Sequence, residues 1–169
     1  KNAITQAMYQ KLTAGLLEGE QDDTIRAIVF LGTKGCFSAG NDMADFLGFA
    51  MAGAVGEPAA FGLLRALTEV TKPLVSGVDG LAIGIGTTLH MHCDLTIASD
   101  RSLFKTPFVD LALVPEAASS LIAPRIMGHQ RAFAMLAASE GFSAEQAREA
   151  GLIWKVVAPG EVEAETLKI

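Results

Sequence analysis

The amino-acid sequence predicts an α/β fold in a single domain. Short apolar segments of strand length alternate along the chain with longer segments whose apolar residues recur at helical spacing. Glycine or proline stands at the ends of several of these segments, where the chain has to turn. A length of 169 residues with 50% hydrophobic content is enough for one domain with a sizeable core, and the chain shows no internal repeat or linker.

The first elements are a helix and a strand. Thr5 is a candidate N-cap for an amphipathic helix that ends at the acidic pair beginning at Asp22. The apolar face of this helix consists of Met8, Leu12 and Leu16. Residues 25–31 are apolar and β-branched enough to form a buried strand, which Gly32 bounds.

The rest of the chain continues the alternation. A short helix is expected at residues 43–49, followed by a loop at 51–57 and an amphipathic helix at 59–70 that Pro73 terminates. The apolar face of the second helix consists of Phe61, Leu64, Leu67 and Val70. The remaining expected elements are a strand at 74–78, a helix at 87–93, a strand at 94–98, helices at 117–126 and 131–138 on either side of Gly128, a helix opened by a capping box of Ser143 and Gln146 and closed at Gly151, and a strand at 153–157.

Composition excludes some classes of partner. The net charge is −6 at pH 7 and no basic stripe stands out, so we expect no nucleic-acid partner. No apolar run is long enough to span a bilayer, so we expect no membrane partner. A mean hydropathy of +0.37 with only 19% charged residues indicates that much apolar surface goes into a core or into subunit contacts. Cys36 and Cys93 make no disulfide framework, are expected as small core residues, and suit a reducing cytoplasm.

Two glycine-rich junctions follow apolar strands, at residues 37–42 and 80–88. Glycine in such places lets the backbone approach a ligand and leaves amides pointing outward. Two convergent backbone N–H groups are what an oxyanion hole requires. Gly84 and Gly86 also suggest a dinucleotide site, but Leu89 stands where a third glycine belongs, and we reject that interpretation.

Several motifs together resemble the enoyl-CoA hydratase/isomerase (crotonase) family over nearly the whole chain. They are Phe37 to Asp42 followed by Met43, Lys72 to Val75 with Gly80 to Gly86 and Cys93-Asp94, Val114-Pro115-Glu116, Arg125 to Gly128, and Ala147 to Leu152 with Val156-Val157. The resemblance implies a spiral of repeated ββα units with stacked sheets and surrounding helices. It also implies that residues 1–169 are a single core domain without the family's opening strand and C-terminal helices, which assembles as a homotrimer or dimer of trimers.

The resemblance also implies an acyl-CoA site that stabilises a thioester enolate. Carried over by position, the oxyanion-hole amides are the backbone N–H groups of Asn41 and Ile85, and the catalytic residue is Glu116. The positions expected to contact the substrate are Lys1, Ala3, Ser38, Ala39, Gly40, Asp42, Met43, Phe46, Gly84 and Phe108. Coenzyme A arrives as part of the substrate, and no metal or other cofactor is expected.

The acid–base groups depart from those of the family's hydratases. Thr88 and Phe108 stand where the resemblance expects two glutamates. Hydration needs one group to activate water and another to deliver a proton, so the sequence favours a reaction with a single base. Glu116 matches the glutamate of the peroxisomal-type 3-enoyl-CoA isomerase branch, and apolar neighbours, for which Phe46, Phe108 and Leu121 are candidates, would raise its pKa.

Other interpretations remain open from the sequence. Another crotonase reaction is possible, either hydration or dehalogenase- or hydrolase-type chemistry through Glu116, as is a non-catalytic acyl-CoA-binding protein. A cytoplasmic location is expected, or a peroxisomal one in a eukaryote. Several polar and aromatic residues are expected to have structural roles. They are Asp42 as a helix N-cap, Asp94 and Asp110 as hydrogen-bonding groups, His90 and His92 as residues that bind no metal, and Trp154 as a core or subunit-contact residue.

Overall fold

Two four-stranded sheets organise the protein in a computed structural model that describes residues 1–45, 48 and 57–169. The first sheet has the order β1-β3-β5-β8, with all its neighbouring strands parallel. The second has the order β2-β4-β6-β7, parallel except for the antiparallel β6–β7 pair. The strands are β1 (Ile28–Leu31), β2 (Cys36–Ser38), β3 (Leu74–Val78), β4 (Leu81–Ile83), β5 (Leu95–Ser99), β6 (Leu103–Lys105), β7 (Phe142–Ser143) and β8 (Lys155–Val157).

The chain passes from the first sheet to the second three times, and each time a tight turn makes the connection. The turns join β1 to β2, β3 to β4, and β5 to β6. This is the ββα repeat with two sheets that the resemblance implied, and the expected fold class is confirmed.

One carboxylate ties these three turns together. Asp79, in the β3–β4 turn, accepts the backbone N–H of Gly35 at 2.9 Å and pairs through both oxygens with Arg101 of the β5–β6 turn. This bidentate pair lowers the pKa of Asp79 to about 2. The next residue, Gly80, has φ of +88°, and an added Cβ there would lie 2.0 Å from the carbonyl oxygen of Gly35. The turns are therefore stacked backbone against backbone.

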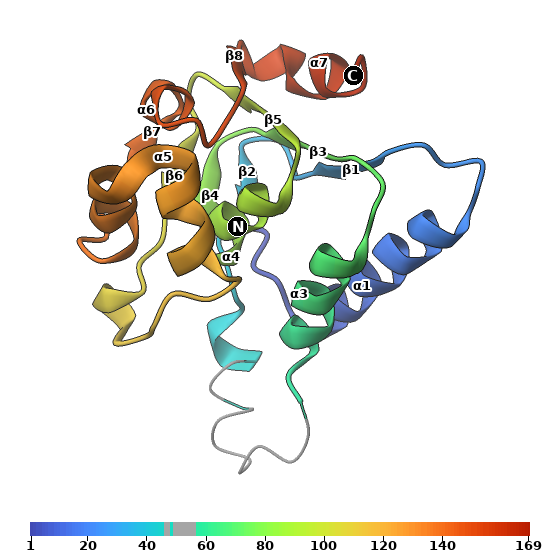
Figure 1. Cartoon of the computed structure of the whole chain (residues 1–169), viewed down its shortest axis with the longest axis horizontal. Helices are drawn as coiled ribbons and strands as arrows, with labels where there is room; N and C mark the ends of the chain where they lie inside the picture. The colour runs from blue at the N-terminus through green and yellow to red at the C-terminus, as the bar shows by residue number, and fades with distance from the viewer. Residues whose placement is uncertain (46–47, 49–56) are drawn as a thin grey trace.

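Helices surround the sheets (Figure 1). On one side α1 (Gln6–Gln21) packs against α3 (Ala59–Glu69), and on the other lie α5 (Ser119–Leu136) and α6 (Ala144–Glu149). The smaller helices are α4 (Ile85–Thr88), η1 (Leu89–His92), η2 (Val109–Leu111), η3 (Pro159–Glu161) and α7 (Val162–Thr166). Within the described part of the chain, no helix is both long enough and apolar enough to cross a membrane.

Several predicted helix caps and breaks are present in the structure. Thr5 caps α1 by accepting the N–H of Met8, and Ser143 with Gln146 forms the expected capping box of α6. The expected break at Gly128 is also present, because this residue has φ of 77° and ψ of 164° inside α5. Of the helix expected at 43–49, residues 43–45 and 48 are helical, and residues 46, 47 and 49 lie outside the described part of the chain.

One expectation about burial was wrong, and a second was confirmed in part. The strand expected to be buried over residues 25–31 begins at Ile28, and only Phe30 of its four residues is buried, because β1 is the edge strand of its sheet. On α1 the fully buried residues are Tyr9, Leu16 and Gly19, while Met8 and Leu12 are only partly buried. The inward face of α1 therefore includes the expected stripe, which packs against the core, and extends to Tyr9 and Gly19.

Candidate active site

Two glycine turns face each other at the ends of β2 and β4. Gly40 has φ of +86° and Gly84 has φ of +58°, values that favour glycine. A Cβ added to Gly40 would lie 2.9 Å from the carbonyl oxygen of Ile83 and 3.9 Å from the Cα of Gly84. This close approach sets the residues that follow the two glycines, Asn41 and Ile85, beside each other.

The backbone of the first turn is held by the N-terminal segment. Ile4 donates its N–H to the carbonyl of Gly40 at 2.8 Å and accepts the N–H of Asp42 at 3.0 Å, forming a parallel bridge to Asn41. In a parallel bridge the partner residue's own N–H and C=O point the opposite way. The N–H of Asn41 therefore faces away from Ile4.

The second amide belongs to a helix start. Gly84 is the N-cap of α4, so the N–H of Ile85 is among those that have no partner inside the helix. Over the described residues, neither the N–H of Asn41 nor that of Ile85 donates to a protein acceptor. Two free, adjacent amide donors are the geometry that an oxyanion hole needs.

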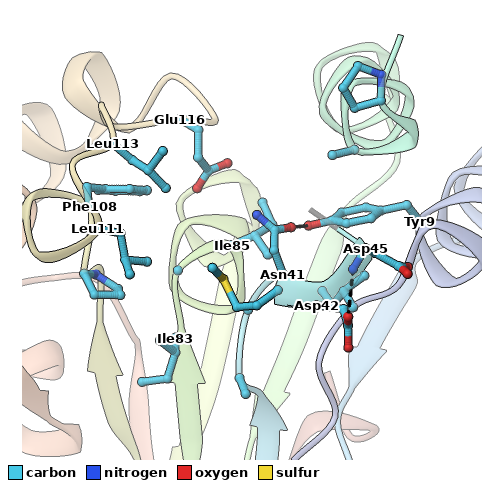
Figure 2. Close-up of a pocket in the computed structure, with 18 of the residues that line it drawn as sticks. Tyr9, Asn41, Asp42, Asp45, Ile83, Ile85, Phe108, Leu111, Leu113 and Glu116 are labelled. Atoms are coloured by element: carbon cyan, nitrogen blue, oxygen red, sulfur yellow. Dashed lines mark hydrogen bonds between the residues drawn. The ribbon is translucent and has the colours of Figure 1, made fainter. Parts of the chain in front are cut away.

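Asn41 and Ile85 both line a cavity of about 470 Å³ (Figure 2). Most of its described wall is apolar and comes from three regions: the start of α3, the β4–α4 turn, and the segment around η2. The apolar wall residues are Ile4, Met43, Pro58, Ala60, Phe61, Leu64, Ile83, Ile85, Pro107, Phe108, Leu111, Leu113 and Val114. A cavity of this kind suits a ligand with an apolar portion and a carbonyl oxygen to place at the amides.

Glu116 reaches the same cavity from the segment before α5. Its Oε1 accepts a hydrogen bond of 2.6 Å from the hydroxyl of Thr88, which is fully buried at the end of α4. Burial raises the pKa of Glu116, and the Thr88 hydrogen bond lowers it by a smaller amount. The wall includes two other carboxylates, but Asp42 caps the helical turn at 43–45 and Asp45 accepts the N–H of Gln6.

A buried tyrosine adjoins the amide of the first turn. Tyr9 of α1 is 2% exposed, lines the cavity, and donates its hydroxyl proton to the side-chain oxygen of Asn41. Burial, with a smaller effect from the charge of Glu116, raises the pKa of this phenol. Figure 2 shows the Asn41 side chain between Tyr9 and the side of the cavity on which Glu116 lies.

Most of the residues predicted for the site come together. The described cavity wall includes Glu116, Asn41, Ile85, Ala39, Gly40, Asp42, Met43, Gly84 and Phe108. Lys1, Ala3 and Ser38 are not part of that wall, and Phe46 lies outside the described residues. Ser38 is buried and braces the turn, since its hydroxyl accepts the N–H of Gly40 and donates to the carbonyl of Asn2.

Some assignments were wrong or incomplete. Leu121 does not cover Glu116, because it is 54% exposed on α5 and is not part of the cavity wall. Trp154 was predicted as a core or subunit-contact residue. It is 57% exposed just before β8 and so is not in the core of this chain, and the subunit contact stays a prediction. Sequence reasoning missed Tyr9 and the hydrogen bond of Thr88. The signal for Tyr9 was present, since it is the only tyrosine of the chain and lies one position from the expected apolar stripe of α1.

Other polar residues that were expected to have structural roles make hydrogen bonds or ion pairs within the protein. Asp94 accepts the N–H of Leu74 at 2.8 Å, and Asp110 pairs with Lys105 at 3.2 Å. His90 contacts Ser76 and His92 contacts the carbonyl of Ala117. Within residues 1–45, 48 and 57–169, no three His, Cys, Asp or Glu side chains gather as metal ligands would.

Comparison with known proteins establishes the family. The family model described as "Enoyl-CoA hydratase/isomerase" matches residues 1–169, and the chain belongs to this family. It is 37% identical over 171 residues to the enoyl-CoA delta isomerase 2 of Rattus norvegicus and 33% identical over 166 residues to the 1,2-epoxyphenylacetyl-CoA isomerase of Escherichia coli. A crystal structure of an enoyl-CoA hydratase/isomerase from Pseudoalteromonas atlantica matches it with a TM-score of 0.91 and 36% identity.

These relatives are longer than the chain. The matches take in 98% and 92% of this chain but 43% and 62% of the rat and E. coli proteins, and 98% of this chain with 65% of the P. atlantica chain. Relatives named as an isomerase and as a probable hydratase match the chain at 37% and 30% identity. Sequence identity therefore establishes the family and does not distinguish between these reactions.

Proposed function

We propose that the protein binds an acyl-CoA thioester, stabilises its enolate, and moves the double bond of a 3-enoyl-CoA to the 2 position. The observation that carries this proposal is that one carboxylate of the described cavity wall, Glu116, is not engaged by a backbone N–H group. Glu116 shares one apolar cavity with the free amides of Asn41 and Ile85, while Asp42 and Asp45 are engaged by backbone N–H groups. The rat relative that matches this chain is named an enoyl-CoA delta isomerase, which supports the same reaction.

Isomerisation is the family reaction that one base can complete. The Glu116 carboxylate removes a proton from C2, and the electrons of that C–H bond flow into the thioester to give a dienolate whose oxygen accepts from the amides of Asn41 and Ile85. The protonated Glu116 then returns the proton to C4, so that the C3=C4 bond becomes C2=C3. No water or redox partner enters the balance, and coenzyme A is carried by the substrate.

Hydration fits these residues less well. Thr88, whose hydroxyl donates to Glu116, and Phe108, which is 5% exposed, occupy the positions at which the resemblance expects the two hydratase glutamates. The Thr88 hydroxyl is hydrogen-bonded to a carboxylate, and the Phe108 ring has no ionisable group. These two side chains therefore do not supply an acid–base pair. The raised pKa of Glu116 suits a group that must both take and return a proton.

The test is a comparison of Glu116→Gln with the wild-type protein, using the whole protein and a 3-enoyl-CoA. We expect double-bond migration and C2-proton exchange into deuterium oxide to fall by about 10²–10⁴-fold while binding of the CoA ester persists. Glu149→Gln, at an exposed position of α6, is the matched control and should leave the rate unchanged. Unchanged migration in Glu116→Gln would remove the residue from the mechanism.

One alternative keeps the same carboxylate but uses it as a nucleophile. Glu116 could form an acyl or aryl ester on a suitable CoA substrate, as the dehalogenase- and hydrolase-type chemistry of this scaffold would require. Intact-mass analysis after mixing with substrate separates the two, since an adduct on Glu116 indicates substitution and exchange without an adduct indicates isomerisation. CoA-ester binding with neither result would favour a non-catalytic binding role.

We also propose that the protein assembles into trimers. Large apolar side chains outside the cavity, Phe133 at 59% and Trp154 at 57% exposure, support burial against another subunit. Sedimentation of the whole protein tests this, and a monomer at micromolar concentration would contradict it.

A further inference from the structure

The hydroxyl of Tyr9 has one described partner, the side-chain oxygen of Asn41. A phenol has a single proton to donate, and the raised pKa keeps that proton in place at every pH at which the protein would work. A carboxamide has one oxygen and one NH₂ group on opposite sides. When Tyr9 holds the oxygen, the NH₂ group must face the other way.

The other way is toward the cavity. Figure 2 shows the amide nitrogen of Asn41 turned from Tyr9 toward the side on which Glu116 lies. Asn41 is exposed and part of the cavity wall, so its NH₂ group is accessible to a ligand in that space. Tyr9, Asn41 and Glu116 all line this one cavity, so the phenol, the amide and the carboxylate border the same space.

We propose that Tyr9 is a positioning residue that orients the Asn41 carboxamide, so that its NH₂ group gives the site a third hydrogen-bond donor beside the two backbone amides. The proposal rests on the function proposed above, because the donor faces the space in which the enolate would form. With the amide turned by half a circle, its carbonyl oxygen would face the same space and repel negative charge there. Tyr9 therefore selects the favourable orientation without touching the reacting atoms.

The first test is Tyr9→Phe, which removes the hydroxyl and keeps the ring in the core. We expect kcat for C2-proton exchange to fall about fivefold to tenfold, the effect of one neutral hydrogen bond, with KM nearly unchanged. Thr13→Ala is the matched control, because the Thr13 hydroxyl is bonded to the carbonyl of Tyr9 on the same helix and has no link to Asn41. That variant should retain full kcat.

A double-mutant cycle separates positioning from a direct role. Asn41→Leu removes the amide and keeps the backbone N–H, and in that background Tyr9→Phe should cause no further loss of kcat. A full fivefold to tenfold loss in the Leu background would overturn the proposal, since Tyr9 would then act on its own or only through stability. No loss in Tyr9→Phe alone would overturn it as well.

The pH profile provides a readout that a purely structural role would not change. Among the described titratable and polar groups near Glu116, Thr88 on α4 donates to its carboxylate, and Tyr9, Asp42 and Asp45 line the same cavity. His92 contacts the carbonyl of Ala117, the next residue along the chain. Asn41→Asp satisfies the Tyr9 hydroxyl but sets a negative charge where NH₂ stood, so the acid limb of the profile should move to higher pH. An unmoved limb would show that the side chain at position 41 does not lie near the reacting carboxylate, which would contradict the proposal.

The outcomes for this proposal and for the proposed function are distinguishable. Exchange at C2 reports enolate formation whether or not a double bond migrates, so Tyr9→Phe can be scored even if another reaction follows. If Glu116→Gln abolishes migration while Tyr9→Phe has no effect, the isomerase proposal stands and the positioning proposal fails. If the wild-type protein exchanges no C2 proton, both fail.

Discussion

Replacing Gly40 by alanine is the sharpest test of the proposed oxyanion hole. Gly40 has φ of +86°, and its added Cβ would stand 2.9 Å from the carbonyl oxygen of Ile83, a backbone atom of β4. Because that oxygen is held in a strand, the turn at Gly40 has to move. The movement separates the amide of Asn41 from that of Ile85.

The expected magnitude has two parts. An alanine held in the left-handed region costs about 1–3 kcal/mol of stability. Loss of one oxyanion-hole donor costs about 10²–10³-fold in kcat. We therefore expect Gly40→Ala to lower kcat by about 100-fold, with a much smaller change in KM, because the hole holds the enolate more strongly than the bound substrate.

Gly128→Ala provides the control for backbone strain. Gly128 has φ of +77°, and a Cβ added there meets no atom within 4 Å. The control variant should lose a similar amount of stability in urea unfolding and keep the kcat of the wild-type protein for C2-proton exchange. If both variants lose kcat equally, or if Gly40→Ala keeps full activity, the paired-amide explanation is wrong.

Three further predictions concern carboxylates. The pKa of Asp79 falls from 3.8 to about 2 on folding, so Asp79→Asn should lose about 2 kcal/mol at neutral pH in urea unfolding, and the difference should disappear as pH falls from 3.8 to about 2. The pKa of Glu116 is raised by burial, which disfavours the charged form, so Glu116→Gln should melt at a higher temperature than the wild type above the ordinary value of 4.5, with the gap closing below it. A gap of equal size at pH 3 and pH 8 would contradict this. Thr88→Val removes the hydrogen bond that lowers the Glu116 pKa, so the acid limb of kcat/KM should move to higher pH, while Thr88→Ser should leave it in place.

The first sheet was largely predictable from the sequence, and the second was not. Strands β3, β5 and β8 carry apolar runs that matched expectation within two residues. The strands of the second sheet have only two or three residues each and stand next to turns. Such segments are too short to show a period of two, so their glycine-flanked sequences predict turns when taken singly. Only the family resemblance indicated a second layer.

The candidate site shows the same limit. Glu116, Asn41 and Ile85 were predicted from the resemblance by position, and the structure brings them to one cavity. The contact between Tyr9 and Asn41 joins residues 32 positions apart, and no local pattern reports it. A tyrosine beside a helical apolar stripe predicts core packing, and only the tertiary arrangement shows where its hydroxyl points.

The two free amides also bear on how ligand binding and folding are connected. The residue before Ile85 has a protein partner for its N–H, since Gly84 donates to the carbonyl of Lys105 at 2.8 Å. The N–H groups of Asn41 and Ile85 have no acceptor among the described residues. The oxygen of a bound thioester would accept from these two N–H groups. A substrate would therefore stabilise the folded protein, and the unfolding temperature would rise with substrate concentration.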